Sequence, residues 1–167
     1  MAQPLFINRT DLVRNSIIDG NVDTDKFIYF INISQTIHIQ NYLGTELYQE
    51  FEGMITAGTL TLVANPNHYN LMVDYIQPML IWFAQVDYIP FAAYQIRNGG
   101  VFKHRSENSE SASKEELDYL VAKAREYAEY YSRRFIDYMS FNQATFPKYY
   151  SNSNDDIDPS QDAIFNG

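Results

Sequence analysis

The chain contains no cysteine and only three histidines. Without cysteine it can form neither a disulfide framework nor a catalytic thiol nor a cysteine-ligated zinc site. His38, His68 and His104 lie far apart and lack the spacing of metal ligands. We therefore expect each histidine to be a surface or packing residue.

Basic residues are scarce as well. The chain has 12 Lys and Arg and 21 Asp and Glu, which gives a net charge of −9. A surface that reads DNA or grips its phosphates is normally basic, so this balance argues against such a surface. It remains compatible with a protein that surrounds DNA without gripping it.

Several functional patterns are missing. The glycines form neither GxGxxG nor GxxxxGK[ST], so no phosphate-binding loop is expected. Glu46, Glu50 and Glu52 have no histidine three positions on, and the acidic residues after position 154 lack the pattern of an EF-hand. We expect no catalytic, metal-binding or cofactor-binding site, and we expect that the protein is not an enzyme.

Long hydrophobic runs are also absent. The apolar run at 78–84 is far shorter than the about 20 residues of a membrane span. The N-terminus shows no basic start followed by an apolar stretch, so no signal peptide is expected.

Aromatic residues, by contrast, are abundant: 14 Tyr, 11 Phe and 1 Trp make up 16% of the chain. Tyrosine is common where proteins meet, because its ring buries a large area while its hydroxyl tolerates water. The same rings can equally fill a core, and the sequence leaves both uses open.

The apolar periodicity predicts one all-α domain, a helical bundle of about four main helices. The helices are expected at about 24–41, 46–57, 67–93 and 114–139. In the first helix one stripe is expected to face the core: Phe27, Ile31, Ser34, Ile37 and Asn41. Gly44 is expected to end this helix and Thr45 to cap the next one.

The third and fourth helices carry further signals. The third is apolar on nearly all sides, which is typical of a central helix or of an interface helix. Pro78 and Pro90 lie inside it, so we expect kinks or a break, above all near Pro90. Ser113 and Glu116 form a capping box at the start of the fourth helix. Its apolar seam is expected to be Leu117, Val121, Ala124, Ala128, Tyr131, Phe135 and Tyr138.

A small β-hairpin is expected between the third and fourth helices, because Asn98–Gly99 is the pair best suited to a type I′ turn. Its residues are our candidates for contact with a neighbouring subunit or partner: Arg97, Asn98, Gly99, Gly100, Val101, Phe102 and Lys103.

The composition changes at Pro147. We therefore separate a helical domain, residues 1–146, from an extended or flexible C-terminal tail, residues 147–167. A polar, acidic spacer in this tail joins aromatic residues at its front to an apolar tip, and such a segment does not fold alone. The candidate docking residues are Tyr149, Tyr150, Ile164 and Phe165. A disordered, solubilising tail is the alternative.

Six stretches occur in a characteristic order: NVDTD at 21–25, HIQNYLGTELY at 38–48, IQP at 76–78, NGGV at 98–101, the serine-rich 106–113, and RFIDY at 134–138. Together they span most of residues 21–139. In this series the chain resembles a family of head–tail connector, or adaptor, proteins of tailed bacteriophages, particularly phages of Bacteroidetes such as crAss-like phages.

The resemblance implies a structural virion protein that forms a homo-oligomeric ring of twelve copies beneath the portal protein. Such a ring extends the DNA channel and docks neighbouring tail or ring proteins. Double-stranded DNA would pass through it without specific binding, and an acidic lining suits that passage. The implied location is the head–tail junction of the virion, and the host cytoplasm during assembly. The alternative is a soluble helical adaptor or regulator that binds a partner helix in a cell.

Overall fold

The structure is a computed structural model. It describes residues 3–8, 10–11, 24–92, 94–97, 100–103, 112–151 and 156–163. The helices in these ranges are α2 (Thr24–Ser34), the π-helix η1 (Gln35–Ile39), α3 (Gln40–Leu43), α4 (Thr45–Ala57), α5 (Pro66–Leu71), the π-helix η2 (Met72–Ile76), α6 (Gln77–Ala92), α7 (Lys114–Phe141), the 3₁₀ helix η3 (Gln143–Thr145) and α8 (Pro147–Tyr150). The predicted all-α fold with about four main helices is therefore confirmed. Among the described residues, none of the helices combines the length and the apolar composition that a membrane span requires.

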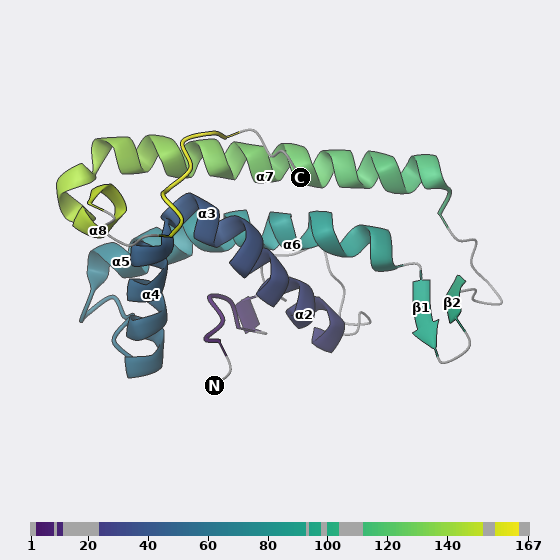
Figure 1. The fold of residues 1–167 in the computed structure, drawn as a ribbon, viewed down its shortest axis with the longest axis horizontal. Coiled ribbons are helices and arrows are strands. Elements are labelled where there is room, and N and C mark those ends of the chain that lie inside the picture. The colour runs from purple at the N-terminus through teal and green to yellow at the C-terminus, as the bar shows by residue number, and fades with distance from the viewer. Residues whose placement is uncertain are drawn as a thin grey trace.

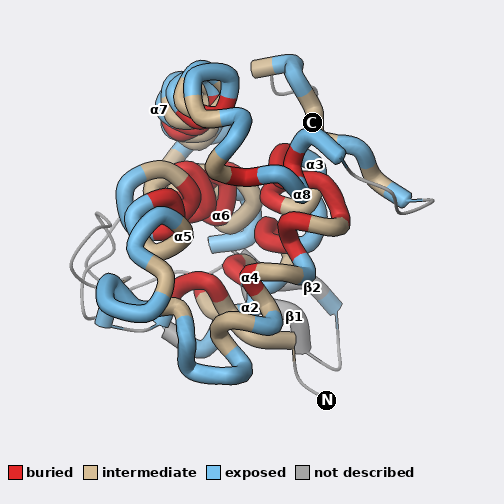
Figure 2. Tube along the Cα trace, turned by 90° about the vertical axis from the view of Figure 1, so that its left-hand side faces the viewer, coloured by how far each residue is buried: buried red, intermediate tan, exposed pale blue. Residues whose placement is uncertain are grey.

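α6 is the central helix of the bundle. α7 packs along one side of it and α2 along another, so that α6 lies between them (Figures 1 and 2). Its buried residues cover more than one face: Met79, Leu80, Ile81, Phe83, Ala84, Gln85 and Val86. This explains why the segment is apolar on nearly all sides, and it selects the central helix from the two interpretations of the sequence.

The first helix contains a π turn, η1, and this turn changes which residues face the core. Phe27, Ile31 and Ser34 are buried as expected, but Ile37 is 53% exposed and Asn41 is exposed as well. The prediction was wrong for these two residues, because the π turn adds one residue to the helical repeat. The buried set after the turn is Gln35, His38, Ile39, Tyr42 and Leu43.

A second π turn, η2, lies just before Pro78. Pro78 has no N–H to bond the carbonyl four residues earlier, and the wider turn before it accommodates that missing bond. The disturbance expected from the prolines therefore lies at Pro78, and the prediction that the helix would break above all near Pro90 was wrong. Pro90 stays inside α6, which ends two residues later at Ala92.

α7 begins with the predicted capping box. The Ser113 Oγ accepts a hydrogen bond from the Glu116 N–H, and the Glu116 carboxylate accepts one from the Ser113 N–H at 2.7 Å. The fully buried seam of α7 is Ala124, Ala128, Ser132, Phe135 and Met139. Four residues expected in this seam are only half-buried: Leu117, Val121, Tyr131 and Tyr138.

The short strands β1 (Tyr94–Arg97) and β2 (Gly100–Lys103) pair antiparallel, with Tyr94 opposite Lys103. They lie beyond the end of α6, away from α4 (Figure 1). Residues 98–99 lie outside the described residues, so the type I′ turn predicted there stays a prediction.

Candidate interaction surfaces

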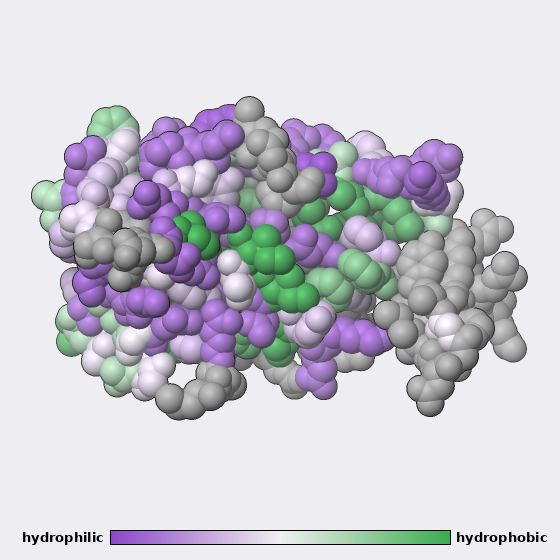
Figure 3. Space-filling view, viewed as in Figure 1, coloured by the Kyte–Doolittle hydropathy of each residue, from purple (hydrophilic) through white to green (hydrophobic). Residues whose placement is uncertain are grey.

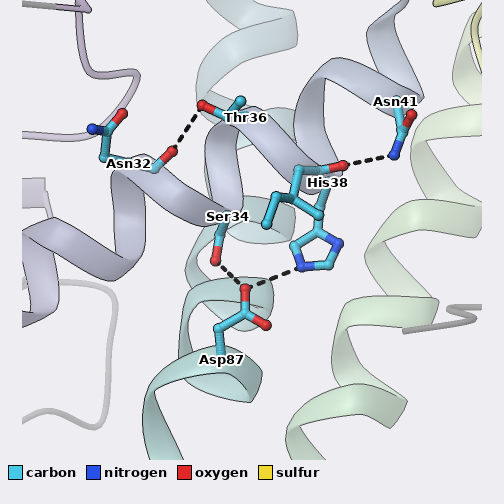
Figure 4. A network of polar contacts seen from close by, with 7 residues as sticks. Asn32, Ser34, Thr36, His38, Asn41 and Asp87 are labelled. Carbon is cyan, nitrogen blue, oxygen red and sulfur yellow. Dashed lines mark hydrogen bonds and ion pairs between the residues drawn. The ribbon is translucent and has the colours of Figure 1, made fainter. Parts of the chain in front are cut away.

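A polar network joins η1 to α6 and brings a serine, a histidine and an aspartate together (Figure 4). The Ser34 hydroxyl donates to the Asp87 Oδ2 at 2.5 Å, and the His38 Nε2 lies 3.0 Å from the same oxygen. The His38 ring also stacks on Phe83, with 4.4 Å between the ring centroids.

The order of these groups decides their chemistry. In a nucleophilic triad the histidine lies between the serine and the aspartate and takes the proton of the serine. Here the carboxylate of Asp87 lies between Ser34 and His38 and accepts a hydrogen bond from the hydroxyl. This network holds η1 against α6, and it does not place the His38 ring against the Ser34 hydroxyl as the general base of a triad.

The same π turn is supported by side-chain bonds to its backbone. The Thr36 hydroxyl donates to the Asn32 carbonyl at 3.1 Å, and the Asn41 amide donates to the Ile37 carbonyl at 2.6 Å (Figure 4). The Gln35 side chain, fully buried, donates to the Pro4 carbonyl and accepts from the Phe6 N–H at 2.8 Å. The π turn is thereby tied to the N-terminal segment as well.

His68 takes part in a second polar group. Its Nε2 lies 3.3 Å from one carboxylate oxygen of Glu50, and the Lys148 ammonium lies 3.8 Å from the other. The group borders an open cleft of about 530 Å³, lined by Glu46, Gln49, Glu50, Gly53, Met54, Thr59 and Lys148. Among the described residues no group of three or more His, Cys, Asp or Glu is arranged to hold a metal ion. His104 lies outside the described residues.

The residues predicted to contact a neighbouring subunit fall in and between the two strands. Arg97 pairs with Gly100 and Val101 pairs with Ile96, while Phe102 and Lys103 continue β2. Asn98 and Gly99 lie outside the described residues. The structure therefore brings the described members of this set together in one strand pair.

The front of the tail packs on its own domain. Phe146 is fully buried, and Tyr149 is only 3% exposed, with its ring edge-on to Phe135 at a centroid distance of 6.0 Å. Burial raises the pKa of the Tyr149 hydroxyl, and the hydrogen bond from the Gln161 amide opposes that shift. Tyr150 is 43% exposed and its hydroxyl donates to the Met139 carbonyl. Ile164 and Phe165 lie outside the described residues.

The part of the tail at 156–163, here called the strap, is extended and lies across the junction between α3 and α4 at the periphery of the molecule (Figures 1 and 2). The Thr45 N–H donates to the Ile157 carbonyl at 2.9 Å, and the Ser160 N–H donates to the Asn41 carbonyl at 2.8 Å. The Thr45 hydroxyl donates to the Asp156 carboxylate at 2.8 Å and accepts from the Ile157 N–H.

The prediction that Thr45 caps the second helix was wrong. Gly44, with φ +74°, occupies the position between the two helices, and α4 begins at Thr45 itself. The Thr45 hydroxyl binds the strap and makes no capping bond to its own helix. The sequence carries no signal for this pairing, because its two halves are 111 positions apart and are joined largely through backbone groups.

α7 has a second aromatic face, which is exposed. Tyr119 is 62% exposed, Leu120 46%, Tyr127 46% and Tyr130 55%. Since a helix repeats every 3.6 residues, Tyr119 and Tyr130 lie opposite the buried seam, while Leu120 and Tyr127 lie beside it. The Tyr127 ring also contacts Trp82 of α6, with 4.7 Å between the ring centroids. We call these four residues the α7 face. On the face shown in Figure 3, apolar residues are also exposed in the middle of the molecule and between α6 and α7, within a surface that is otherwise mostly hydrophilic.

Comparison with known proteins identifies a family. The sequence model of a family described as "Family of unknown function (DUF6712)" matches residues 39–158, which reach from η1 to the strap. No curated protein and no solved structure matches the chain.

Proposed function

The chain belongs to the family of unknown function DUF6712, and we propose that it is a structural virion subunit that forms a ring at the head–tail junction of a tailed bacteriophage. In this proposal the ring lies beneath the portal protein, extends the DNA channel and docks tail components. The observation that carries the proposal is the α7 face, and the resemblance in the order of sequence stretches gives the proposal its phage context.

The α7 face has the composition of a protein interface. Exposed tyrosines are enriched where subunits meet, whereas a monomer rarely leaves a row of them in water. The row runs from Tyr119 to Tyr130 in α7, a rise of about 17 Å at 1.5 Å per residue. A patch of this length, about three helical turns, offers each subunit of a ring a compact surface for contact with the next.

Two further features support this function. The strand pair lies beyond the helical bundle, where it can reach a neighbouring subunit (Figure 1). The net charge of −9 suits a channel through which DNA slides, because an acidic wall repels the phosphates instead of holding them. Twelve copies, a portal partner and passage of double-stranded DNA belong to the same proposal.

The test is a pair of substitutions on the α7 face, Tyr119→Ser with Tyr130→Ser. Because both side chains are more than half exposed, the subunit should keep its helix content and its stability, while the assembled fraction falls at least about tenfold, the effect of 1.4 kcal/mol of lost contact. Val63→Ser is the matched control, since Val63 is 95% exposed in the loop between α4 and α5.

Sedimentation velocity of the double variant, the control and the unaltered protein gives the assembled fraction. Unchanged assembly of the double variant contradicts the role of the α7 face. A stable monomer in all three samples instead supports the alternative, an adaptor that offers this face to a partner helix.

A further inference from the structure

The strap occupies a binding site that is built from helix ends. The last carbonyls of a helix and the first N–H groups of the next have no partner inside their helices. At the α3–α4 junction the strap supplies partners to the Asn41 carbonyl and the Thr45 N–H. Thr45 is buried, so losing the strap would leave its N–H and hydroxyl short of these bonds.

The fit of the strap depends on a missing side chain. A Cβ built on Gly44 would lie 2.7 Å from the Pro159 Cδ, closer than real Cβ contacts allow. Only glycine leaves the room that Pro159 fills, so the junction matches this segment in shape as well as in hydrogen bonding. The site therefore fits an extended segment that carries an acidic residue opposite Thr45 and a proline opposite Gly44.

Nothing in these contacts requires both halves to come from one chain. The strap follows α8 through residues 152–155, a short polar stretch, and its Ile157 and Pro159 are only half-buried. A neighbouring copy that offers the same junction would give the same bonds, which is why exchange of an identical segment between copies costs little.

We propose that in the assembled ring the strap of each subunit binds the α3–α4 junction of the neighbouring copy, while in the free monomer it binds its own. This inference rests on the proposed function, because the ring is what keeps a second junction within reach. In the monomer the short connection favours the bond within the chain, through its high effective concentration. In the ring each exchanged strap ties two subunits together, and Gln161 then meets the neighbour's Tyr149 hydroxyl.

Because the chain has no cysteine, engineered thiols report the pairing without background. Thr45→Cys and Asp156→Cys are made as two separate proteins, since the Thr45 hydroxyl and the Asp156 carboxylate are 2.8 Å apart. The two are mixed, assembled and treated with a short bismaleimide. A cross-link between the two proteins can form only if the strap of one copy reaches the junction of another.

Thr45→Cys and Asp156→Cys remove side-chain groups that bond the strap to the junction, so a second pair of cysteine variants is needed. Asn41→Cys and Ser160→Cys leave in place the backbone bond that joins these two residues. For each pair the variant with both cysteines in one chain is also cross-linked. When this variant is cross-linked in rings, its mass on a denaturing gel should shift from that of the monomer to multiples of the monomer mass. When it is cross-linked as a dilute monomer, its mass should stay that of the monomer.

The outcomes separate the inference from the function on which it rests. Cross-links between the mixed proteins in assembled rings support the exchange. If rings form by native mass spectrometry but both pairs cross-link only within one chain, the exchange is wrong and the ring stands. If no ring forms at any concentration, the mass spectrum itself overturns both proposals.

Discussion

Pro159 lies directly over Gly44, where its Cδ would be 2.7 Å from a Cβ added to that glycine. The backbone of Gly44 also has φ +74°, a conformation that residues other than glycine rarely adopt. One residue thus provides both the turn between α3 and α4 and the space in which the strap lies.

Gly44→Ala should therefore destabilise the protein by about 1–3 kcal/mol, through backbone strain and displacement of the strap. Gly53→Ala is the control, because Gly53 lies inside α4 with no atom within 4 Å of an added Cβ. It should stabilise the fold by about 0.5–1 kcal/mol, as alanine does in a helix. Urea unfolding of both variants gives the values, and equal effects would contradict the close packing of Pro159.

Tyr149 and Tyr150 should behave differently although they are neighbours. Tyr149→Ala removes a buried ring and should cost about 3–5 kcal/mol, as aromatic truncations in a core do. Tyr150→Ala removes a partly exposed ring and one hydrogen bond, and should cost about 1 kcal/mol. Thermal or urea unfolding gives both values. A Tyr149→Ala variant as stable as the unaltered protein would mean that this ring is free for a partner.

The Asp87 carboxylate should hold η1 in place. Asp87→Ala deprives Ser34 and His38 of a shared acceptor and should cost about 1–3 kcal/mol. Asp137→Ala, at an exposed position of α7, should stay within about 0.5 kcal/mol of the unaltered protein. Denaturant unfolding of the two variants compares them directly, and a loss at Asp137 as large as at Asp87 would argue against a specific role of the network.

Alkaline pH should unfold the protein through its buried tyrosines. Burial raises the pKa of the Tyr42, Tyr48 and Tyr149 hydroxyls above the ordinary tyrosine value of about 10. A raised pKa means that the folded state keeps its protons longer than the unfolded state. The stability from these groups is thus complete below the unfolded pKa, about 10, and is lost as the pH rises through the folded values.

Urea unfolding from about pH 8 to about pH 11.5 should show this decline above pH 10, together with tyrosinate absorbance as the protein unfolds. Tyr48→Phe removes one of the ionisable groups and should make the decline less steep, whatever its effect at neutral pH. A stability that stays constant up to pH 11.5 would contradict burial of these hydroxyls.

Local patterns in the sequence predicted much of the fold. The capping box at Ser113 depends on two residues three positions apart, and the all-round apolar segment indicated that α6 is either a central helix or an interface helix. The two π turns were not predictable in this way, because each adds one residue to a repeat that otherwise looks regular. For that reason Ile37 and Asn41 were placed on the wrong side of the first helix.

The interaction surfaces, too, were predictable from the sequence only in part. Abundant tyrosine in the last helix indicated contacts, but only the structure separates the buried seam at Phe135 from exposed Tyr119 and Tyr130. The strap was beyond sequence reasoning, since its bonds to Thr45 span 111 and 112 positions. Its polar composition is typical of a free tail, and the fixed partners come from helix ends that exist only in the folded protein.

Single-particle electron microscopy of the purified 19.4 kDa protein, alone and at increasing concentration, tests the proposed function without any variant. We predict closed rings around a central channel, with twelve copies in each ring and the α7 face buried between neighbours. A particle that stays monomeric at every concentration, with the α7 face in water, would contradict the ring and with it the function proposed for this chain.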